Sequence, residues 1–351
     1  MSTIRSLPGS CLLAALIAGT AAASRHESSP AAQDAIAAST SAILQGDAGQ
    51  ALAALEPVPA AEFSAKDAGY RACMFARLQR SAPPRLVESI EDEFVVEVLR
   101  LYRDYWWHAL QAPAQRQALE QRLHAQLQAL LGSAAEGAAD FDALEPILTA
   151  ELERRGFHAQ LGRTPPLREL MLWRRQDSRS YDVRLPEGPH TVHVELLDDF
   201  VTRGWSAYGR CERGSSGGWA TAEKLYAIVP AYDKDGGLAS EAFQVVFLGH
   251  ETQHFADQNR YPGMASWELE YRAKLVELAQ AETVSGKRLR GFMTAQSDNI
   301  DSPHTYANKR LIAALTARLG RAPDTVPVPD LQAAARAELL TDSARREPGG
   351  K

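Results

Sequence analysis

Apolar residues recur at helical spacing through the first half of the chain. Between Glu91 and Leu110 the large apolar side chains lie three or four positions apart, which is the period of one face of an α-helix. The same spacing predicts further helices over residues 35–55, with a break at Gly46-Asp47, and over residues 65–79, 115–131 and 141–155. No segment repeats at a fixed period, so we expect a plain helical bundle over residues 33–165, after a polar and disordered segment over residues 24–32.

The pattern changes after Thr164-Pro165-Pro166, and we place a domain boundary there. Short runs rich in apolar, aromatic and β-branched residues predict strands over residues 170–173, 181–185 and 191–197. A further strand is expected over residues 225–229, where two interpretations stay open: an edge strand that pairs with an extended peptide, or an ordinary core strand. The chain is therefore predicted to be mainly helical α+β, with a small antiparallel or mixed sheet after the bundle.

Helices return in the last third of the chain. Ser240 is a suitable N-cap for a helix over residues 241–259, and a second helix is expected to begin near Ser266. Periodicity fades towards the C-terminus, so residues 323–351 are expected to form a loose tail. Residues 166–322 then make up the second domain.

The composition is that of an ordinary soluble globular protein. Hydrophobic residues make up 45% of the chain and charged residues 23%, and the net charge is −6. Because this balance provides no basic surface for nucleic acid, we expect no nucleic-acid partner.

The N-terminus has the pattern of a secretory signal peptide. Arg5 precedes a short apolar run that ends at the small residues 21–23, which predicts a signal peptide over residues 1–23. The run is shorter than the roughly 20 residues that a membrane span needs. Cys11 precedes the run instead of following it, which argues against a lipoprotein. We therefore expect a periplasmic or secreted protein with no membrane span after cleavage.

Two cysteines, Cys73 and Cys211, remain after that cleavage. In an exported protein they predict one intrachain disulfide, which would tie the N-terminal helices to the β-containing region. Two free buried thiols are the alternative, because a sequence does not show whether two Cα atoms lie within bonding distance.

The strongest chemical signal is the string His250-Glu251-Thr252-Gln253-His254, which falls inside the helix predicted over residues 241–259. Residues four apart share a helix face, so both imidazoles point the same way and can hold one zinc ion, with Glu251 beside them. The histidines share the inward face with Phe243 and Phe247. Burying two imidazoles without a partner is costly, which favours a metal site over a chance match.

A catalytic zinc ion keeps three protein ligands and one open position, so a third ligand is needed. On the helix that begins near residue 266, Glu270 lies in the middle of the apolar arc. Glu268 lies on the opposite face, where we expect it to pair with Arg272. Glu270 is therefore the predicted ligand, and a buried salt bridge with Lys274 is the alternative. Glu277, on the same face, is expected to contact a ligand.

A His-Glu-x-x-His helix followed by a glutamate on the next helix resembles the gluzincin class of zinc peptidases. Residues 270–274 are similar to a Glu-x-x-Ala-Asp segment of that class, with Lys274 where those families have aspartate. Asp257 is a candidate for the carboxylate contact that this change removes. Residues 247–257 and 269–275 are similar to a group of uncharacterised exported bacterial proteins that carry the motif.

The resemblance implies a zincin-like second domain in which Zn2+ is held by His250, His254 and Glu270. Glu251 would then act as general base, taking a proton from the attacking water and delivering it to the leaving amine of a peptide or protein substrate.

A later helix, starting at Ser302 and Pro303, is expected to present His304 or Tyr306 as the donor that stabilises the oxyanion. A capped surface helix is the alternative. The competing function is a non-catalytic cell-envelope binding or scaffold protein with a structural zinc site. Glu251 favours the hydrolase, because a structural site does not need a carboxylate at that position.

Overall fold

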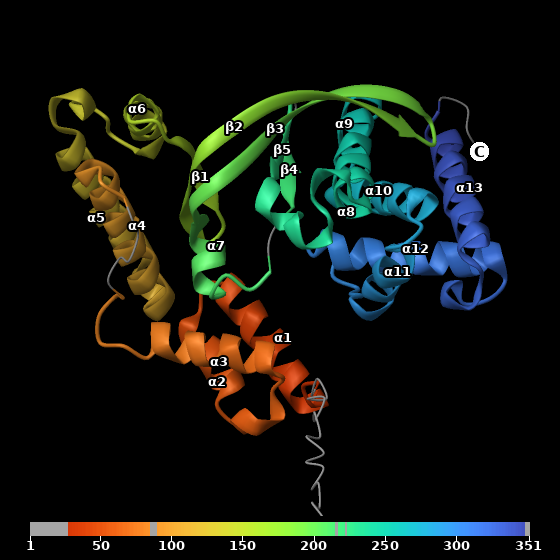
Figure 1. Ribbon diagram of the computed structural model, residues 1–351, viewed down its shortest axis with the longest axis horizontal. Helices are drawn as coiled ribbons and strands as arrows, with labels where there is room; N and C mark the ends of the chain where they lie inside the picture. The colour runs from red at the N-terminus through yellow and green to blue at the C-terminus, as the bar shows by residue number, and fades with distance from the viewer. Residues whose placement is uncertain (1–26, 85–89, 215–216, 222, 348–351) are drawn as a thin grey trace, which may run out of the picture.

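The structure, a computed structural model, describes residues 27–84, 90–214, 217–221 and 223–347. It is a mainly helical α+β protein in which a five-stranded mixed sheet lies between two groups of helices (Figure 1). The signal peptide predicted over residues 1–23 lies outside the described residues. Nowhere in the described part of the chain is a helix both long enough and apolar enough to cross a membrane.

The predicted N-terminal helices are all present. They are α1 (Pro30–Leu44), α2 (Ala48–Leu55), α3 (Ala65–Leu78), α4 (Glu93–Gln111), α5 (Arg116–Leu131) and α6 (Phe141–Arg154). Short polar side chains begin most of them: Ser29, Asp47, Ser64, Asp92 and Asp140 each accept a backbone N–H of the following first turn. These bonds satisfy N–H groups that have no partner inside the helix, which explains why the boundaries could be predicted.

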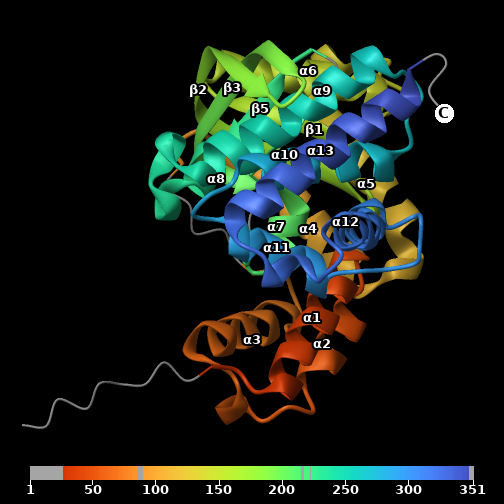
Figure 2. The same cartoon turned by 90° about the vertical axis from the view of Figure 1, so that its right-hand side faces the viewer.

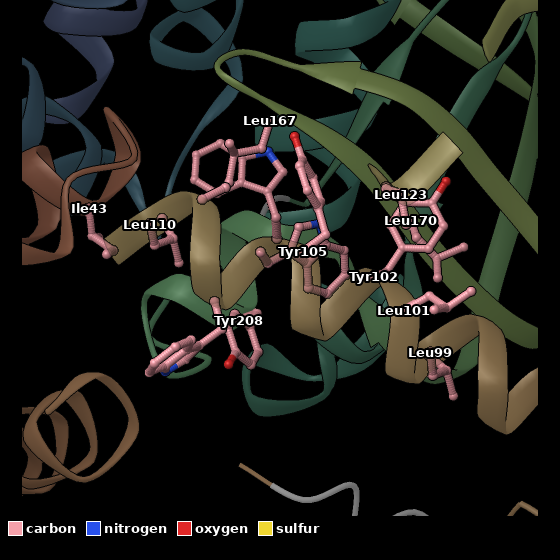
Figure 3. Close-up of a cluster of buried hydrophobic side chains, with 14 of the residues drawn as sticks. Ile43, Leu99, Leu101, Tyr102, Tyr105, Leu110, Leu123, Leu167, Leu170 and Tyr208 are labelled. Atoms are coloured by element: carbon pink, nitrogen blue, oxygen red, sulfur yellow. The ribbon is translucent and has the colours of Figure 1, made fainter. Parts of the chain in front are cut away.

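The first hydrophobic core lies between these helices and the near end of the sheet. Tyr102 and Trp106 of α4 are fully buried at its centre. The indole of Trp106 donates to the carbonyl oxygen of Arg168 over 2.9 Å, which joins the helix to the sheet. Figure 3 shows part of this core, in which side chains of α4 lie near Leu123, Leu167, Leu170 and Tyr208.

The sheet has the strand order β1-β2-β3-β5-β4. Its strands are β1 (His158–Thr164), β2 (Leu167–Leu185), β3 (Gly188–Arg203), β4 (Gly218–Ala220) and β5 (Leu225–Ile228). β3 and β5 are parallel, and the other neighbours are antiparallel. The long β2–β3 hairpin arches from the N-terminal helices to the C-terminal helices (Figure 1). The short helix α7 (Gly204–Gly209) follows β3.

Two strand predictions need correction. The strands predicted over residues 170–173 and 181–185 are parts of one strand, β2, because the polar residues between them pair with β3 instead of forming a loop. β5 lies between β3 and β4, so the edge-strand interpretation of residues 225–229 is wrong, and β4 is the edge strand on that side of the sheet. β2 is buried at both ends and exposed in the middle, because each end packs on a different core.

The C-terminal helices surround a second core. They are α8 (Glu241–Phe243), α9 (His250–Arg260), α10 (Ser266–Gln280), α11 (Ser285–Thr294), α12 (Pro303–Leu319) and α13 (Val328–Arg346). α10 is the central helix, and α9, α12 and α13 pack against it (Figure 2). Leu275, Val276 and Leu278 of α10 are fully buried.

The loose ends predicted at residues 24–32 and 323–351 are wrong in their described parts. Pro30–Ala32 belong to α1, and Ala32 is fully buried. α13 covers α10 with an inward face made largely of alanine and leucine. Alanine contrasts weakly with polar neighbours in hydropathy, and this explains why the helical period of the tail was missed.

The predicted disulfide is present. Cys73 of α3 and Cys211, which follows α7, are bonded with their Cα atoms 6.1 Å apart. Leu167, Leu170 and Trp205 belong to the first core, which therefore extends past the boundary placed near residue 165. The disulfide thus closes the N-terminal core at its junction with the sheet.

Candidate metal centre

The helix that carries the histidines begins as predicted. The side chain of Ser240 accepts the Phe243 N–H over 3.2 Å, and Phe243 and Phe247 are buried in the second core. Between them and the histidines, Gln244–Gly249 form a π-helical turn, a feature that is frequent at functional sites and has no signature in this sequence. Because the phenylalanines fix the inward face, the imidazoles that follow are turned towards α10.

The two imidazoles of the motif converge. The Nε2 atoms of His250 and His254 lie 2.9 Å apart, and each side chain is 12% exposed. Two nitrogens bound at about 2.05 Å to a tetrahedral metal would lie about 3.3 Å apart. A small spreading of the rings therefore gives the separation that a metal ion requires.

Glu270 of α10 completes the group. Its Oε1 lies 3.4 Å from Nε2 of His254, and its Oε2 lies 3.8 Å from Nε2 of His250. One ligand atom from each of the three residues falls within 4.8 Å of the others, so this buried group could hold a metal ion. Two imidazole nitrogens and one carboxylate are a donor set that catalytic zinc sites use.

Glu270 also makes the salt bridge that was the alternative prediction. The ammonium of Lys274 donates to Oε2 of Glu270 over 2.8 Å, and Nδ1 of His304 lies 2.7 Å from the same oxygen. Burial raises the pKa of Glu270, but hydrogen bonds from the three histidines outweigh burial and hold that pKa far below its usual range. The carboxylate is therefore ionised, which is the form that binds a metal.

Glu277 orients the first histidine. It is fully buried, and its Oε1 lies 2.7 Å from Nδ1 of His250, as its position on the helix predicted. Its Oε2 accepts from Nε of Arg288 over 2.5 Å. Burial lowers the pKa of His250, but hydrogen bonds to Glu270 and Glu277 outweigh it and raise that pKa to about 10. A metal ion at Nε2 would displace a proton, while Nδ1–H remains bonded to Glu277.

Two predicted contacts around these residues are wrong. Asp257 does not approach a ligand: it accepts from Arg272 over 2.8 Å and from Gln253 over 2.9 Å. Arg272 is fully buried and does not pair with Glu268, which instead caps α10 at Ala265. The helical projection placed Arg272 on the surface because it did not anticipate that α13 covers this side of α10.

Two of the three candidate ligands, His250 and Glu270, line a cleft of about 590 Å3. Glu251 lines this cleft beside His250 and Glu270. Tyr232 lines it too, and burial together with the charge of Glu251 raises the pKa of Tyr232 above its usual value. The neutral phenol donates to the carbonyl oxygen of Gly217 over 2.7 Å.

Of the two residues at the start of α12 that were candidates for the oxyanion donor, one lies at the cleft. His304 lines the cleft, with a side chain that is 72% exposed. Tyr306 is not among the lining residues: its ring packs edge-on against Trp267, and its hydroxyl accepts from Arg310 over 2.8 Å. Ser302 occupies the N-cap position, but its side chain makes no capping hydrogen bond.

Other cleft residues gave no signal in the sequence. Asp235, Lys287 and Arg288 line the cleft, together with Gly217 and Gly218 beside β4. These residues come from separate elements, including α11 and β4, so no local spacing predicts their meeting. A separate cavity of about 400 Å3 lies between β1, β2 and α7 and contains none of the predicted site residues.

The chain matches no protein-family model, and comparisons with the curated proteins and with the solved structures also find no match. The function of this chain is therefore inferred from the geometry of the site.

Proposed function

We propose that this protein is an exported zinc-dependent hydrolase, and that its substrate is a peptide or protein. His250, His254 and Glu270 would hold the metal ion, and Glu251 would be the general base. The observation that carries the proposal is the convergence of two imidazoles and one ionised carboxylate beside a cleft that His250, Glu270 and Glu251 line.

Zinc is the metal that best suits this donor set. Two neutral imidazoles and one carboxylate in a closely spaced group are typical of catalytic zinc, whereas calcium and magnesium prefer oxygen ligands only. When bound, zinc would polarise a carbonyl group and lower the pKa of water at its open position.

Three residues of the chain would supply the other parts of the mechanism. Glu251 accepts a proton from the attacking water and passes it to the leaving nitrogen, as a carboxylate beside the ligands can do. Glu277 fixes the ring of His250 so that Nε2 faces His254 and Glu270. His304, exposed at the cleft, is the remaining candidate for a donor to the developing oxyanion.

An extended peptide suits the shape of this site. The edge strand β4 begins at Gly218, which lines the cleft with Gly217. An extended chain can add to the edge of a sheet through backbone hydrogen bonds. The Cys73–Cys211 disulfide supports export, because such bonds persist in oxidising compartments such as the periplasm.

The test is Glu251→Gln, measured for peptide hydrolysis and for zinc content. We expect hydrolysis to fall by at least about 100-fold, since a positioned general base contributes that much or more, while about one zinc ion per chain is retained. Unchanged hydrolysis in the variant would contradict the proposed role of Glu251. Zinc binding without hydrolysis in the wild type would favour a structural zinc site in a scaffold protein.

A further inference from the structure

Lys274 is buried beside the three candidate ligands, His250, His254 and Glu270. Its side chain is 5% exposed, and Nζ donates to Oε2 of Glu270 over 2.8 Å and to the carbonyl oxygen of His304 over 3.1 Å. The lysine therefore links α10 to the first turn of α12.

The two oxygens of Glu270 have different surroundings. Oε2 is close to two donors, Nζ of Lys274 and Nδ1 of His304. Oε1 faces Nε2 of His254 at 3.4 Å. Because Oε2 already has these partners, Oε1 is the oxygen that is left to bind a metal ion.

We propose that Lys274 is a positioning residue that holds Glu270 as a one-oxygen ligand and, through its charge, lowers the affinity of the site for zinc. This inference rests on the proposed function. A cation bonded to a ligand carboxylate withdraws charge from it and repels a divalent ion across a short distance. In the metal-free protein the same ammonium neutralises a buried carboxylate. Both effects oppose metal binding.

The consequence for chemistry is a more electrophilic metal ion. A carboxylate that shares its charge with Lys274 donates less to zinc, so zinc would polarise a substrate more strongly. Among the described residues, Lys274 is the lysine or arginine bonded to a carboxylate of the ligand group, whereas Arg288 is bonded to Glu277. Replacing Lys274 therefore changes the charge at Glu270 and leaves the partner of His250 in place.

The experiment compares the full-length mature protein with Lys274→Met and Lys274→Arg. Lys309→Met is the matched control, because Lys309 lies on α12 and pairs with exposed Asp298. The zinc dissociation constant is measured by competition with a chromogenic chelator. Thermal unfolding of the metal-free proteins and the visible spectrum of the cobalt-substituted proteins are recorded alongside.

We expect Lys274→Met to bind zinc at least about tenfold more tightly, because removing a nearby positive charge favours a divalent cation. Its metal-free form should unfold at a lower temperature than the wild type, because Glu270 is left without its cation. Its cobalt spectrum should change as Oε2 loses one of its two donors and keeps only His304. Lys274→Arg and Lys309→Met should stay within about threefold of the wild-type affinity, because both keep the charge at Glu270.

Two results would overturn the inference in different ways. Unchanged or weaker zinc binding by Lys274→Met, beside a wild type that binds zinc, refutes the role of Lys274 and leaves the proposed function standing. A wild type that binds no zinc refutes both. Should Lys274→Met not fold, Lys274→Gln removes the charge while keeping a polar side chain, and the same tightening is expected.

Discussion

At the scale of single residues, hydrogen bonds to neighbouring side chains determine which atom of each candidate ligand remains free to bind a metal ion. Glu277 occupies Nδ1 of His250, so Nε2 is the nitrogen that faces the ligand group. Lys274 and His304 occupy Oε2 of Glu270. In contrast, Nδ1 of His254 is buried without a hydrogen-bond partner in the described part of the chain. Hydrogen bonds on the side away from the ligand atoms therefore orient His250 and Glu270, whereas only packing orients the ring of His254.

Glu277→Gln tests the support of His250. The substitution keeps the shape of the side chain but removes the charge that orients and strengthens the imidazole, so we expect zinc affinity to fall about 10–100-fold. Competition with a chelator measures this loss. Glu282→Gln, an exposed glutamate just after α10, is the control and should bind like the wild type. Equal affinities in the two variants would show that Glu277 does not support the ligand.

Helical spacing could predict that the side chains of the candidate ligands meet, because they lie on two helices that follow each other in the sequence. His250, His254, Glu270 and Glu277 all occupy inward faces that the apolar neighbours define. The contact of His304 with Glu270 depends on how α12 crosses α10, which spacing does not encode. For the same reason spacing does not predict that Tyr306, two residues after His304, packs against Trp267 instead.

At the scale of elements, Arg272 joins four segments around one guanidinium group. Its nitrogens donate to Asp257 of α9, to Asp342 of α13 and to Glu187 in the β2–β3 turn. The arginine itself lies on α10 and is fully buried. Arg272 thus fixes three segments to α10, the helix that carries Glu270: the β2–β3 turn, α9 with its two histidines, and α13.

Arg272→Met is expected to destabilise the protein by about 3–5 kcal/mol, because it leaves buried carboxylates without their cation. Chemical denaturation measures the change in the free energy of unfolding. Arg310→Met serves as the control, because Arg310 makes an exposed hydrogen bond to Tyr306, and its effect should stay within about 0.5 kcal/mol. A cost for Arg272→Met no larger than that of the control would contradict this account of the network.

The sequence could not predict this network. Arg272, Asp257 and Glu187 come from three separate elements. Helical spacing assigns Arg272 to the surface and Asp257 to the inward face near the histidines, and neither position predicts that the two side chains pair. The fourth element, α13, was predicted to be a loose tail because its buried face is rich in alanine. Without that cover, the side of α10 that carries Arg272 was assigned to the surface.

At the scale of the whole molecule, the sheet joins two cores. A disulfide and a partly buried hydrogen-bond network hold the N-terminal core together. The disulfide joins α3 to the segment after α7. Asp67 of α3 accepts from Arg213 over 2.6 Å and from the hydroxyl of Ser28, which precedes α1. Burial raises the pKa of Asp67, but these hydrogen bonds outweigh burial and hold the pKa below its usual value.

A pH dependence follows from Asp67. A carboxyl group whose pKa is lower in the folded state stabilises that state above its unfolded pKa of about 4, and the contribution is lost as pH falls through the folded value. The wild type should therefore unfold at a higher temperature than Asp67→Asn at neutral pH, and the difference should shrink below about pH 4. Thermal unfolding between pH 3 and pH 7 measures this. A difference that stays constant with pH would show that the charge of Asp67 does not contribute.

The central claim is that His250, His254 and Glu270 hold one zinc ion. Elemental analysis of the purified mature protein, beside Glu270→Ala, tests it most directly. The account predicts about one zinc ion per chain in the wild type and a loss of that zinc in the variant. A wild type that contains no metal after incubation with zinc, or a variant that keeps it in full, would contradict the claim.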